Sequence, residues 1–360
     1  MRICTVVGAR PQFIKAASLS AEFRRHHTEV LVHTGQHYDY EMSRAFFDEL
    51  SLPVPDFNLG TGSGRHGAQT GAMLAGIEAI LHEQVPDLVV VIGDTNSTLA
   101  GALAAAKLQL PVAHVEAGLR SYRRSMPEEI NRVLTDHLST WLFCPTATSV
   151  RNLEREGIRT GVYQTGDVLD DSLLLALPRA RGADGIKTRL GIDARIPFAL
   201  VTLHRAENTD DPARLAAFAE VLPRLGLPVV FPVHPRARAA LSAAGHWDRL
   251  VSAERVVMTE SVSYLDSLRL VEAARVVLTD SGGLQREAAA LGVPCVVARE
   301  ETEWVETLEG GRTVLEANFE VLPALVERLL AGAVAGPRPD VAPRAGASRR
   351  IREILETSMP

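Results

Sequence analysis

Short apolar runs alternate with longer helical stretches along most of this chain, and this alternation restricts the fold more than any other feature of the sequence. Uninterrupted apolar runs are typical of parallel strands that are covered on both faces. A helix after each strand requires right-handed crossovers, which build a doubly wound sheet. The sequence therefore predicts an α/β fold with parallel sheets.

The alternation occurs twice. In the first half, strands are predicted at residues 2–7, 29–33, 87–92, 112–115, 141–143 and 162–164, with helices at 12–25, 40–50, 67–84, 97–108, 128–139 and 147–156. In the second half, strands are predicted at residues 198–202, 228–231, 256–258, 276–278 and 295–297, with helices at 212–225, 235–244, 264–273, 283–291 and 319–330.

Two domains agree with the chain length, since 360 residues at about 150 per domain correspond to about two. We predict a first Rossmann-like domain over residues 1–166 and a second over residues 188–335, with a last helix over residues 347–357. Residues 167–187 are less periodic and contain Pro178 and Gly182, so they are the predicted linker.

Composition excludes several classes of partner. Hydrophobic residues make up 46% of the chain, enough for two cores, and the 23% of charged residues argues against a disordered chain. Aromatic residues are 5%, too few to predict stacking platforms for single-stranded nucleic acid. The net charge of −6 offers no global basic field for nucleic acid or anionic lipid, although local cations can still hold a small anion.

Cysteine usage and apolar run length predict a cytoplasmic protein without a membrane span. Cys4, Cys144 and Cys295 lie far apart in apolar runs, which indicates buried free thiols rather than a metal site or a disulfide framework. The longest apolar runs are shorter than the roughly 20 residues that cross a bilayer. No signal peptide is expected before the first strand.

Ligands of doubly wound sheets bind at the carboxyl ends of the strands, so polar residues at those points are the candidate site. The first strand is followed by Gly8 and Arg10, with Pro11 at a first helical position and Lys15 further along. Arg10 lies near a helix N-terminus, where anions are favoured, although it can also be a surface arginine beside a turn. The GxGxxG fingerprint is missing, so no nicotinamide dinucleotide is expected.

Three acids also follow predicted strands of the first half, namely Asp94, Glu116 and Glu128. Each has a plainer interpretation: Asp94 as a helix cap, and Glu128 with Arg132 as a surface ion pair on one helix face. Clustered carboxylates can divide acid and base roles or bind a divalent metal. No acid pair has metal spacing, so we favour proton transfer and predict no metal.

In the second half, His204 and His234 follow successive strands, and each can contact a phosphate, move a proton or be a structural histidine.

The most informative segment of the second half runs from a strand into a helix through Asp-Ser-Gly-Gly. Gly282 and Gly283 let a diphosphate approach the backbone N–H groups of the helix N-terminus, and Ser281 adds a hydroxyl donor. Glu287 lies further along the helix, where an acid can bind ribose hydroxyls. Arg299 begins a polar loop that can close on a nucleotide.

Eight motifs, in order, resemble those of the non-hydrolysing UDP-N-acetylglucosamine 2-epimerases: GARPQFIK, TGQH, GDTNSTLAGALAA, HVEAGLRS, MPEEINR, TLHRAEN, DSGGLQREA and REETEW. The resemblance runs from residue 2 to about residue 315. It implies a two-domain fold like that of GT-B glycosyltransferases, with the active site in the interdomain cleft and helix 347–357 packed back on the first domain. It also implies a homodimer that needs no cofactor and serves the synthesis of cell-surface polysaccharide precursors.

The resemblance further implies a reaction that interconverts UDP-N-acetylglucosamine and UDP-N-acetylmannosamine. Loss of the C2 proton and of UDP gives a 2-acetamidoglucal, and UDP then adds back with protonation on the opposite face. The implied leaving-group residues are Arg10, Lys15, His204, Ser281, Gly282 and Gly283, with His234 also at the substrate.

For the sugar, the implied acids and bases are Asp94, Glu116 and Glu128, with Arg132 holding a carboxylate or phosphate; which acid takes the proton first stays open. Glu287 would hold the ribose and Arg299 would lie near the uracil.

Alternatives remain at this stage. The spellings GARPQFIK, MPEEINR, TLHRAENTDDP and TEWVE also resemble the branch that acts on UDP-2,3-diacetamido sugars, which leaves the C3 substituent open. Gln36 and His37 match the site at which many bacterial members bind activating substrate, but the Tyr38–Tyr40 and Gly60–Gly67 stretches depart from that pattern. A GT-B glycosyltransferase and a non-catalytic UDP-sugar sensor are the competing function classes.

Overall fold

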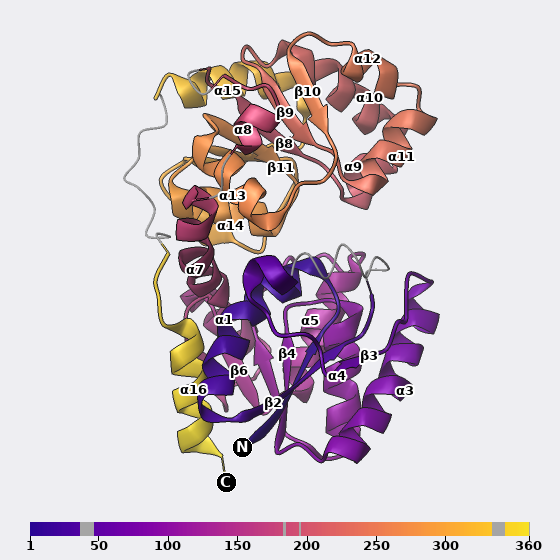
Figure 1. Ribbon diagram of the computed structural model, residues 1–360, viewed down its shortest axis with the longest axis vertical. Coiled ribbons are helices and arrows are strands. Elements are labelled where there is room, and N and C mark those ends of the chain that lie inside the picture. The colour runs from indigo at the N-terminus through magenta and orange to yellow at the C-terminus, as the bar shows by residue number, and fades with distance from the viewer. Residues whose placement is uncertain (37–46, 183–184, 194–195, 333–342, 360) are drawn as a thin grey trace. The chain divides into compact units, whose positions relative to one another are not determined.

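The computed structural model describes residues 1–36, 47–182, 185–193, 196–332 and 343–359, and these form two compact units. Unit 1 comprises Met1–Ala176 and Arg344–Pro360, and unit 2 comprises Leu177–Pro343 (Figure 1). Each unit contains its own sheet with helices, which confirms the predicted α/β class with two parallel sheets.

Unit 1 has a seven-stranded sheet in the order β3-β2-β1-β4-β5-β6-β7, and every pairing is parallel. Its strands are β1 Arg2–Val7, β2 Thr28–His33, β3 Phe57–Asn58, β4 Leu88–Ile92, β5 Val112–Val115, β6 Trp141–Cys144 and β7 Val162–Gln164. The order reverses between β1 and β4, which creates a topological switch point at their carboxyl ends. Arg10, the first helical residue after β1, and Asp94, in the turn after β4, lie just beyond these two strands.

Helices cover both faces of the unit 1 sheet. Successive residues of a strand point to opposite faces, so the apolar side chains of one strand pack against helices on both sides. Ile3 and Val7 of β1 pack with helices α1 Arg10–His26 and α16 Ala347–Ser358. Cys4 and Val6 pack on the other face with α3 His66–Gln84 and α4 Asn96–Lys107. The remaining helices of this unit are α5 Pro127–Leu138, α6 Ala147–Arg155 and the first part of α7 Val168–Gly182.

The last helix of the chain belongs to unit 1, although all of unit 2 separates it from the rest of that unit. Ile351 and Leu355 of α16 are completely buried, and Ser348 Oγ lies 3.0 Å from Ser18 Oγ of α1. Figure 1 shows α16, in yellow, running beside α1. At the far end of the helix, Trp141 Nε1 donates to Ser358 Oγ at 2.7 Å.

Unit 2 has a six-stranded sheet in the order β10-β9-β8-β11-β12-β13, again with parallel pairings throughout. Its strands are β8 Ala199–Thr202, β9 Val229–Pro232, β10 Val256–Thr259, β11 Val276–Thr279, β12 Cys295–Val297 and β13 Thr313–Leu315. Its α-helices after α7 are α8 Ile186–Arg189, α9 Ala206–Thr209, α10 Pro212–Val221, α11 Pro235–Ala243, α12 Trp247–Val251, α13 Tyr264–Ala273, α14 Gly282–Leu291 and α15 Leu322–Leu330. The order reverses between β8 and β11, so the segments after these strands lie at the second switch point.

The structure differs from the sequence predictions at the sheet edges and in the linker. The edge strands β3 and β13 were not predicted; β3 has two residues, and neither is buried. Most of the predicted linker is helix α7, with Pro178 inside it. The cause is local, since Leu169, Leu173 and Ala176 are buried at helical spacing while Leu174 and Leu175 are exposed and obscure that period. The predicted helix over residues 40–50 lies partly outside the described residues.

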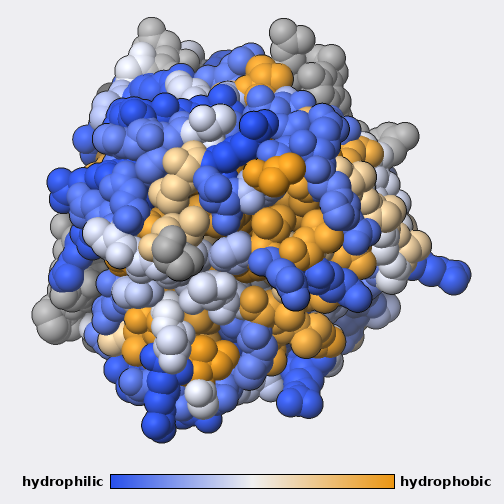
Figure 2. Space-filling view, turned by 90° about the horizontal axis from the view of Figure 1, so that it is seen from below, coloured by the Kyte–Doolittle hydropathy of each residue, from blue (hydrophilic) through white to orange (hydrophobic). Residues whose placement is uncertain are grey.

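Hydrophobic residues also reach the surface. Figure 2 shows several patches of them among hydrophilic residues on one face. Apolar atoms normally contribute more than half of a protein's surface, so such patches need no special explanation. Among the described residues, no helix is long and apolar enough to cross a membrane.

Candidate functional site

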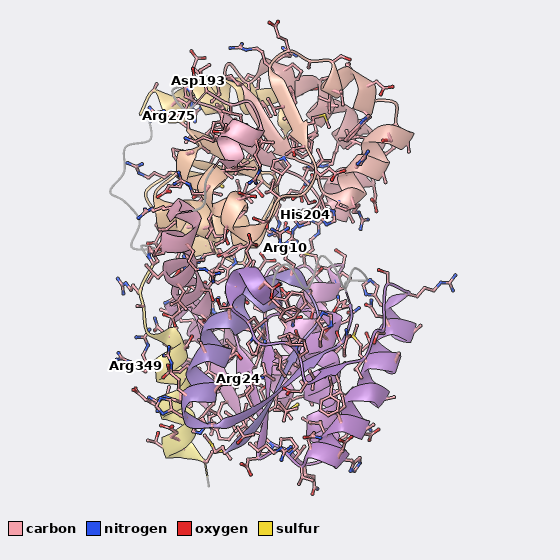
Figure 3. The ribbon with its side chains drawn as sticks, viewed as in Figure 1. Arg10, Arg24, Asp193, His204, Arg275 and Arg349 are labelled. Carbon is pink, nitrogen blue, oxygen red and sulfur yellow. The ribbon has the colours of Figure 1, made fainter. Side chains whose placement is uncertain are left out.

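The predicted site residues are divided between the two units. In unit 1, the loop after β1 leads directly into α1, which begins at Arg10 (Figure 3). Gln12 fixes this loop, because its Oε1 accepts from the backbone N–H of Gly8 at 2.8 Å and its Nε2 donates to the Ile92 carbonyl at 2.8 Å. Gly8 is required by packing, since a Cβ there would lie 2.1 Å from the hydroxyl oxygen of Ser97. The buried side-chain amide of Gln12 therefore joins the loop after β1 to the end of β4.

Lys15 and Glu116 form a largely buried ion pair at this edge of the sheet. Burial raises the pKa of the Glu116 carboxyl; Lys15 opposes this rise, and Asp167 and Asp94 add to it. For Lys15, burial lowers the pKa, but the same three carboxylates outweigh burial and leave that pKa raised. The pair can therefore hold a proton on Glu116 more readily than an exposed carboxyl would.

The backbone at Glu116 is in the left-handed region, with φ at 72°. This conformation is strained for a residue with a side chain and occurs where the surroundings enforce it, often at functional sites. Gly93 lies close by, because a Cβ on it would be 3.3 Å from Glu116 Oε2 and 3.9 Å from Lys15 Nζ. The ends of β4 and β5 therefore meet at the Lys15–Glu116 pair.

Asp94 and Arg132 form a second ion pair among the predicted site residues of unit 1. Arg132 Nη2 donates to Asp94 Oδ2 at 2.5 Å, and Nη1 donates to Glu129 at 2.9 Å. Arg132 thus holds two carboxylates, one of them the predicted acid. Glu128 is half-buried in the first turn of α5, next to Glu129.

Glu129 is a residue that sequence reasoning did not select. Its carboxylate accepts hydrogen bonds from the backbone N–H groups of Ser121 at 2.9 Å and Tyr122 at 2.8 Å, and also from Arg132 Nη1. The signal in the sequence was the adjacent pair Glu128-Glu129, of which the second member has the positioning contacts.

In unit 2, His204 follows β8 and is oriented by Asp280, which follows β11 (Figure 3 labels His204). His204 Nδ1 is 3.1 Å from Asp280 Oδ1, and the backbone N–H groups of His204 and Arg205 donate to the same carboxylate at 3.0 and 2.9 Å. Burial raises the pKa of Asp280, but His204 and these backbone donors outweigh burial and hold that pKa well below its usual range.

His234 lies beside His204, with ring centroids 5.4 Å apart. It is exposed and caps α11, accepting from the Arg236 backbone N–H at 3.2 Å through Nδ1. The structure therefore brings the two predicted histidines together.

The Asp-Ser-Gly-Gly segment begins α14 as predicted. Ser281 caps this helix, and Gly282 and Gly283 form its first turn. A Cβ on Gly282 would lie 3.5 Å from the Trp304 indole, so this turn packs closely against the loop after β12. Glu287 is buried on the same helix. The helix N-terminus provides the backbone donors that a phosphate needs.

Arg299 is completely buried, and its guanidinium pairs with Glu303 at 2.8 and 3.1 Å and lies 3.7 Å from Glu207. Burial lowers the pKa of Arg299, but these carboxylates outweigh it and raise that pKa. Gln285, which the sequence did not single out, ties this loop to α14 through Thr302 and Thr307 at 2.8 and 2.6 Å. The buried Arg299 therefore holds the loop after β12 through its ion pair with Glu303.

Two further placements complete the set of predicted features. Gln36 Oε1 accepts from Ser97 Oγ at 2.7 Å, while His37 and Tyr38–Tyr40 lie outside the described residues.

Within the part of the chain that the structure describes, no three histidine, cysteine or carboxylate side chains are grouped so that they could hold a metal ion. Cys4, Cys144 and Cys295 are buried, and burial raises the pKa of the Cys4 thiol to about 12.

Comparisons with known proteins identify the family and the fold of the chain. The family described as UDP-N-acetylglucosamine 2-epimerase matches residues 21–356. A Methanococcus maripaludis protein called a UDP-N-acetylglucosamine 2-epimerase homolog is 51% identical over 316 residues, 88% of each chain. The UDP-2,3-diacetamido-2,3-dideoxy-D-glucuronate 2-epimerase of Pseudomonas aeruginosa is 47% identical over 323 residues, again 88% of each chain.

A solved structure extends the comparison to the fold. The crystal structure of Methanocaldococcus jannaschii UDP-GlcNAc 2-epimerase in complex with UDP-GlcNAc and UDP superposes with a TM-score of 0.92 at 41% identity, covering 99% of this chain and 100% of that one.

Proposed function

Because the chain belongs to the UDP-N-acetylglucosamine 2-epimerase family, we propose that it inverts C2 of UDP-N-acetylglucosamine and gives UDP-N-acetylmannosamine. The observation that carries this proposal is the pair of carboxylates on neighbouring loops of unit 1, Glu116 and Asp94, in different electrostatic settings. Inversion at C2 needs a base on one face of the sugar and an acid on the other. Two carboxylates with different cation partners are suited to divide these roles.

The proposed reaction breaks two bonds and remakes them. Removal of the C2 proton and departure of UDP with the C1–O electron pair give a 2-acetamidoglucal. Return of UDP to C1 and of a proton to the other face of C2 gives the epimer. Asp94, Glu116 and Glu128 are the proposed proton carriers, with Arg132 holding Asp94.

Charge that develops on the departing UDP needs cations and fixed donors. We assign this role in unit 2 to His204, His234 and the α14 N-terminus with Ser281, Gly282 and Gly283. With Nδ1 turned to Asp280, the His204 ring presents Nε2 on its opposite edge, which suits a hydrogen bond to a phosphate oxygen.

The remaining assignments concern both units. Glu287 would bind the ribose, and Arg299 would shape the loop at the uracil. In unit 1, Arg10 and Lys15 would add positive charge for the leaving group.

A second candidate substrate is a UDP-2,3-diacetamido-2,3-dideoxyglucuronate. The 47% identity to the Pseudomonas aeruginosa enzyme supports it, and the C2 chemistry is the same. Measuring kcat/KM for UDP-N-acetylglucosamine, its 3-acetamido form and the corresponding uronate decides between them, since the larger value identifies the substrate that the site fits best.

Incubation in deuterated water tests the reaction itself. Product UDP-N-acetylmannosamine with deuterium at C2 is expected by mass spectrometry and NMR. A glycosyltransferase would instead retain the C2 hydrogen, and a sensor would bind without exchange. Absence of turnover and exchange on every 2-acetamido UDP-sugar contradicts the proposal.

We further propose that the protein acts in the cytoplasm as a homodimer, without an added cofactor, in the synthesis of cell-surface polysaccharide precursors. The family resemblance supports these points. Light scattering of the purified protein tests the dimer, and turnover after exhaustive dialysis against chelator tests cofactor independence.

A further inference from the structure

A buried histidine of unit 1 lies near Glu116 in sequence and contacts the residue before Asp94. His114, on β5, is completely buried two residues before Glu116. Its Nε2 is 2.8 Å from the carbonyl oxygen of Gly93, the residue before Asp94. Its Nδ1 is 2.7 Å from Oδ1 of Asp136, on α5.

Both partners of this ring are hydrogen-bond acceptors. A backbone carbonyl cannot donate, and Asp136 also receives Arg120 Nη1 at 2.7 Å and the Gly118 N–H at 3.1 Å. Burial raises the pKa of Asp136, but His114 and Arg120 outweigh burial and lower it. Both ring nitrogens of His114 therefore face oxygen atoms, a carboxylate oxygen at Nδ1 and a backbone carbonyl oxygen at Nε2.

The strained backbone at Glu116 is held by contacts of the residues around it. The backbone N–H groups of Glu116 and Ala117 both donate to the Phe143 carbonyl, at 3.0 and 3.1 Å. Gly118 follows with φ at 77°, and a Cβ there would lie 2.4 Å from the Ser149 carbonyl oxygen. Asp136 fixes the Gly118 amide, and His114 fixes the Gly93 carbonyl.

We propose that His114 and Asp136 are positioning residues that keep the Asp94 and Glu116 carboxylates in one fixed relation for proton transfer. Both side chains are completely buried, so a positioning role through neighbouring residues is the one proposed for them. Together they connect the end of β4, the turn after β5 and helix α5 through buried hydrogen bonds, two of them to the Asp136 carboxylate. This inference rests on the proposed epimerase reaction for its effect on rate, but its structural part can be tested without it.

Two substitutions at His114 separate its two contacts. In His114→Asn, the side-chain amide reaches the position of Nδ1 and keeps the bond to Asp136. In His114→Gln, the longer amide reaches the position of Nε2 and keeps the bond to the Gly93 carbonyl. Glu29→Gln is the matched control, because Glu29 is a buried carboxylate of the same unit, bonded to Thr5 at 2.8 Å and to Arg24 at 2.8 Å, and is not part of the site.

The first experiment measures kcat, KM and melting temperature for the full-length wild type and each variant. His114→Asn is expected to lower kcat about ten- to hundred-fold with little change in KM, since small misplacements of reacting groups cost this much. His114→Gln is expected to keep more of kcat than His114→Asn, and Glu29→Gln to lower the melting temperature while kcat is unchanged. Equal kcat for wild type and both His114 variants overturns the proposal, as does a loss of kcat in Glu29→Gln of the same size.

A crystal structure of His114→Asn gives a result that does not depend on activity. Glu116 is expected to leave the left-handed region, or Asp94 to move away from Arg132. Unchanged geometry at both residues overturns the positioning role even if the wild type is active. A wild type without epimerase activity, together with displaced acids in the variant, instead contradicts the proposed function and leaves the positioning role supported.

Discussion

The carboxylate of Asp280 receives the Nδ1 edge of His204, with Oδ1 and Nδ1 3.1 Å apart. The same carboxylate accepts two backbone N–H groups and the side-chain amide of Asn208 at 3.1 Å. One buried acid therefore fixes both the orientation of the histidine and the loop that carries it.

Asp280→Asn is expected to lower kcat about ten- to hundred-fold, because a neutral amide replaces the carboxylate that orients the His204 ring. Steady-state kinetics with the UDP-sugar substrate measures this. Asp211→Asn is the control: Asp211 caps α10 through the Ala213 N–H at 2.9 Å, asparagine caps equally well, and kcat should not change. Wild-type kcat in Asp280→Asn would contradict the role of His204 in the site.

Asp280 also makes the stability of unit 2 depend on pH. Its folded pKa is depressed, so its contribution is complete above the unfolded value of about 3.9 and is lost as pH falls below that value. Urea unfolding between about pH 3 and pH 7 should therefore show a smaller acid loss of unfolding free energy in Asp280→Asn than in the wild type. Parallel curves for the two proteins would be the contrary result.

Glu116→Gln is expected to lower kcat about 10²- to 10⁴-fold, because the amide cannot carry a proton between the solvent and C2. Deuterium exchange at C2 should fall with kcat. Isothermal titration with UDP should change much less, since the proposed UDP contacts lie mainly in unit 2. Retention of exchange at the wild-type rate would remove Glu116 from the mechanism.

Asp167→Asn tests the electrostatic setting of Glu116. Asp167 raises the pKa of Glu116, so its neutral replacement lowers that pKa and should move the Glu116-dependent limb of the kcat profile to lower pH. Asparagine preserves the cap on the Leu169 N–H, 2.9 Å away. Asp56→Asn is the control. It removes a carboxylate charge at a residue that accepts the Leu31 N–H at 2.8 Å, and it should leave the pH profile of kcat in place.

Arg299→Met is expected to destabilise unit 2 by about 3–5 kcal/mol, because it leaves Glu303 buried without its cation. Combining it with Glu303→Leu should restore much of this loss, since a well-packed apolar pair often replaces a buried ion pair without cost. Chemical denaturation of the three proteins measures both steps. A double variant no more stable than Arg299→Met would argue against the ion pair as the cause.

The sequence predicted the elements whose pattern is local. Apolar runs located the central strands, and residues at strand ends, such as Asp94 and His204, lie at the carboxyl edges as expected. Positioning contacts were missed because they join distant segments. His114 and Asp136 are 22 residues apart and Asp280 and His204 are 76 apart, so no local spacing reveals them. A polar residue inside an otherwise apolar strand, as at His114, was the available signal.

Arg299 shows a different limit. From the sequence, Arg299 was predicted to begin a polar loop that can close on a nucleotide; in the structure its guanidinium pairs with Glu303 and lies near Glu207. Sequence identifies a cation at a loop but not whether acids of the same loop neutralise it. Glu303, four residues later, does so here.

The placement of α16 in unit 1 affects the order in which the chain can fold during synthesis. Unit 2 is one continuous segment, whereas unit 1 needs residues from both sides of it. As the polypeptide leaves the ribosome, unit 2 can complete its core before the helix that covers Ile3 and Val7 has been translated. The nascent first unit therefore keeps an apolar face uncovered until α16 has been translated.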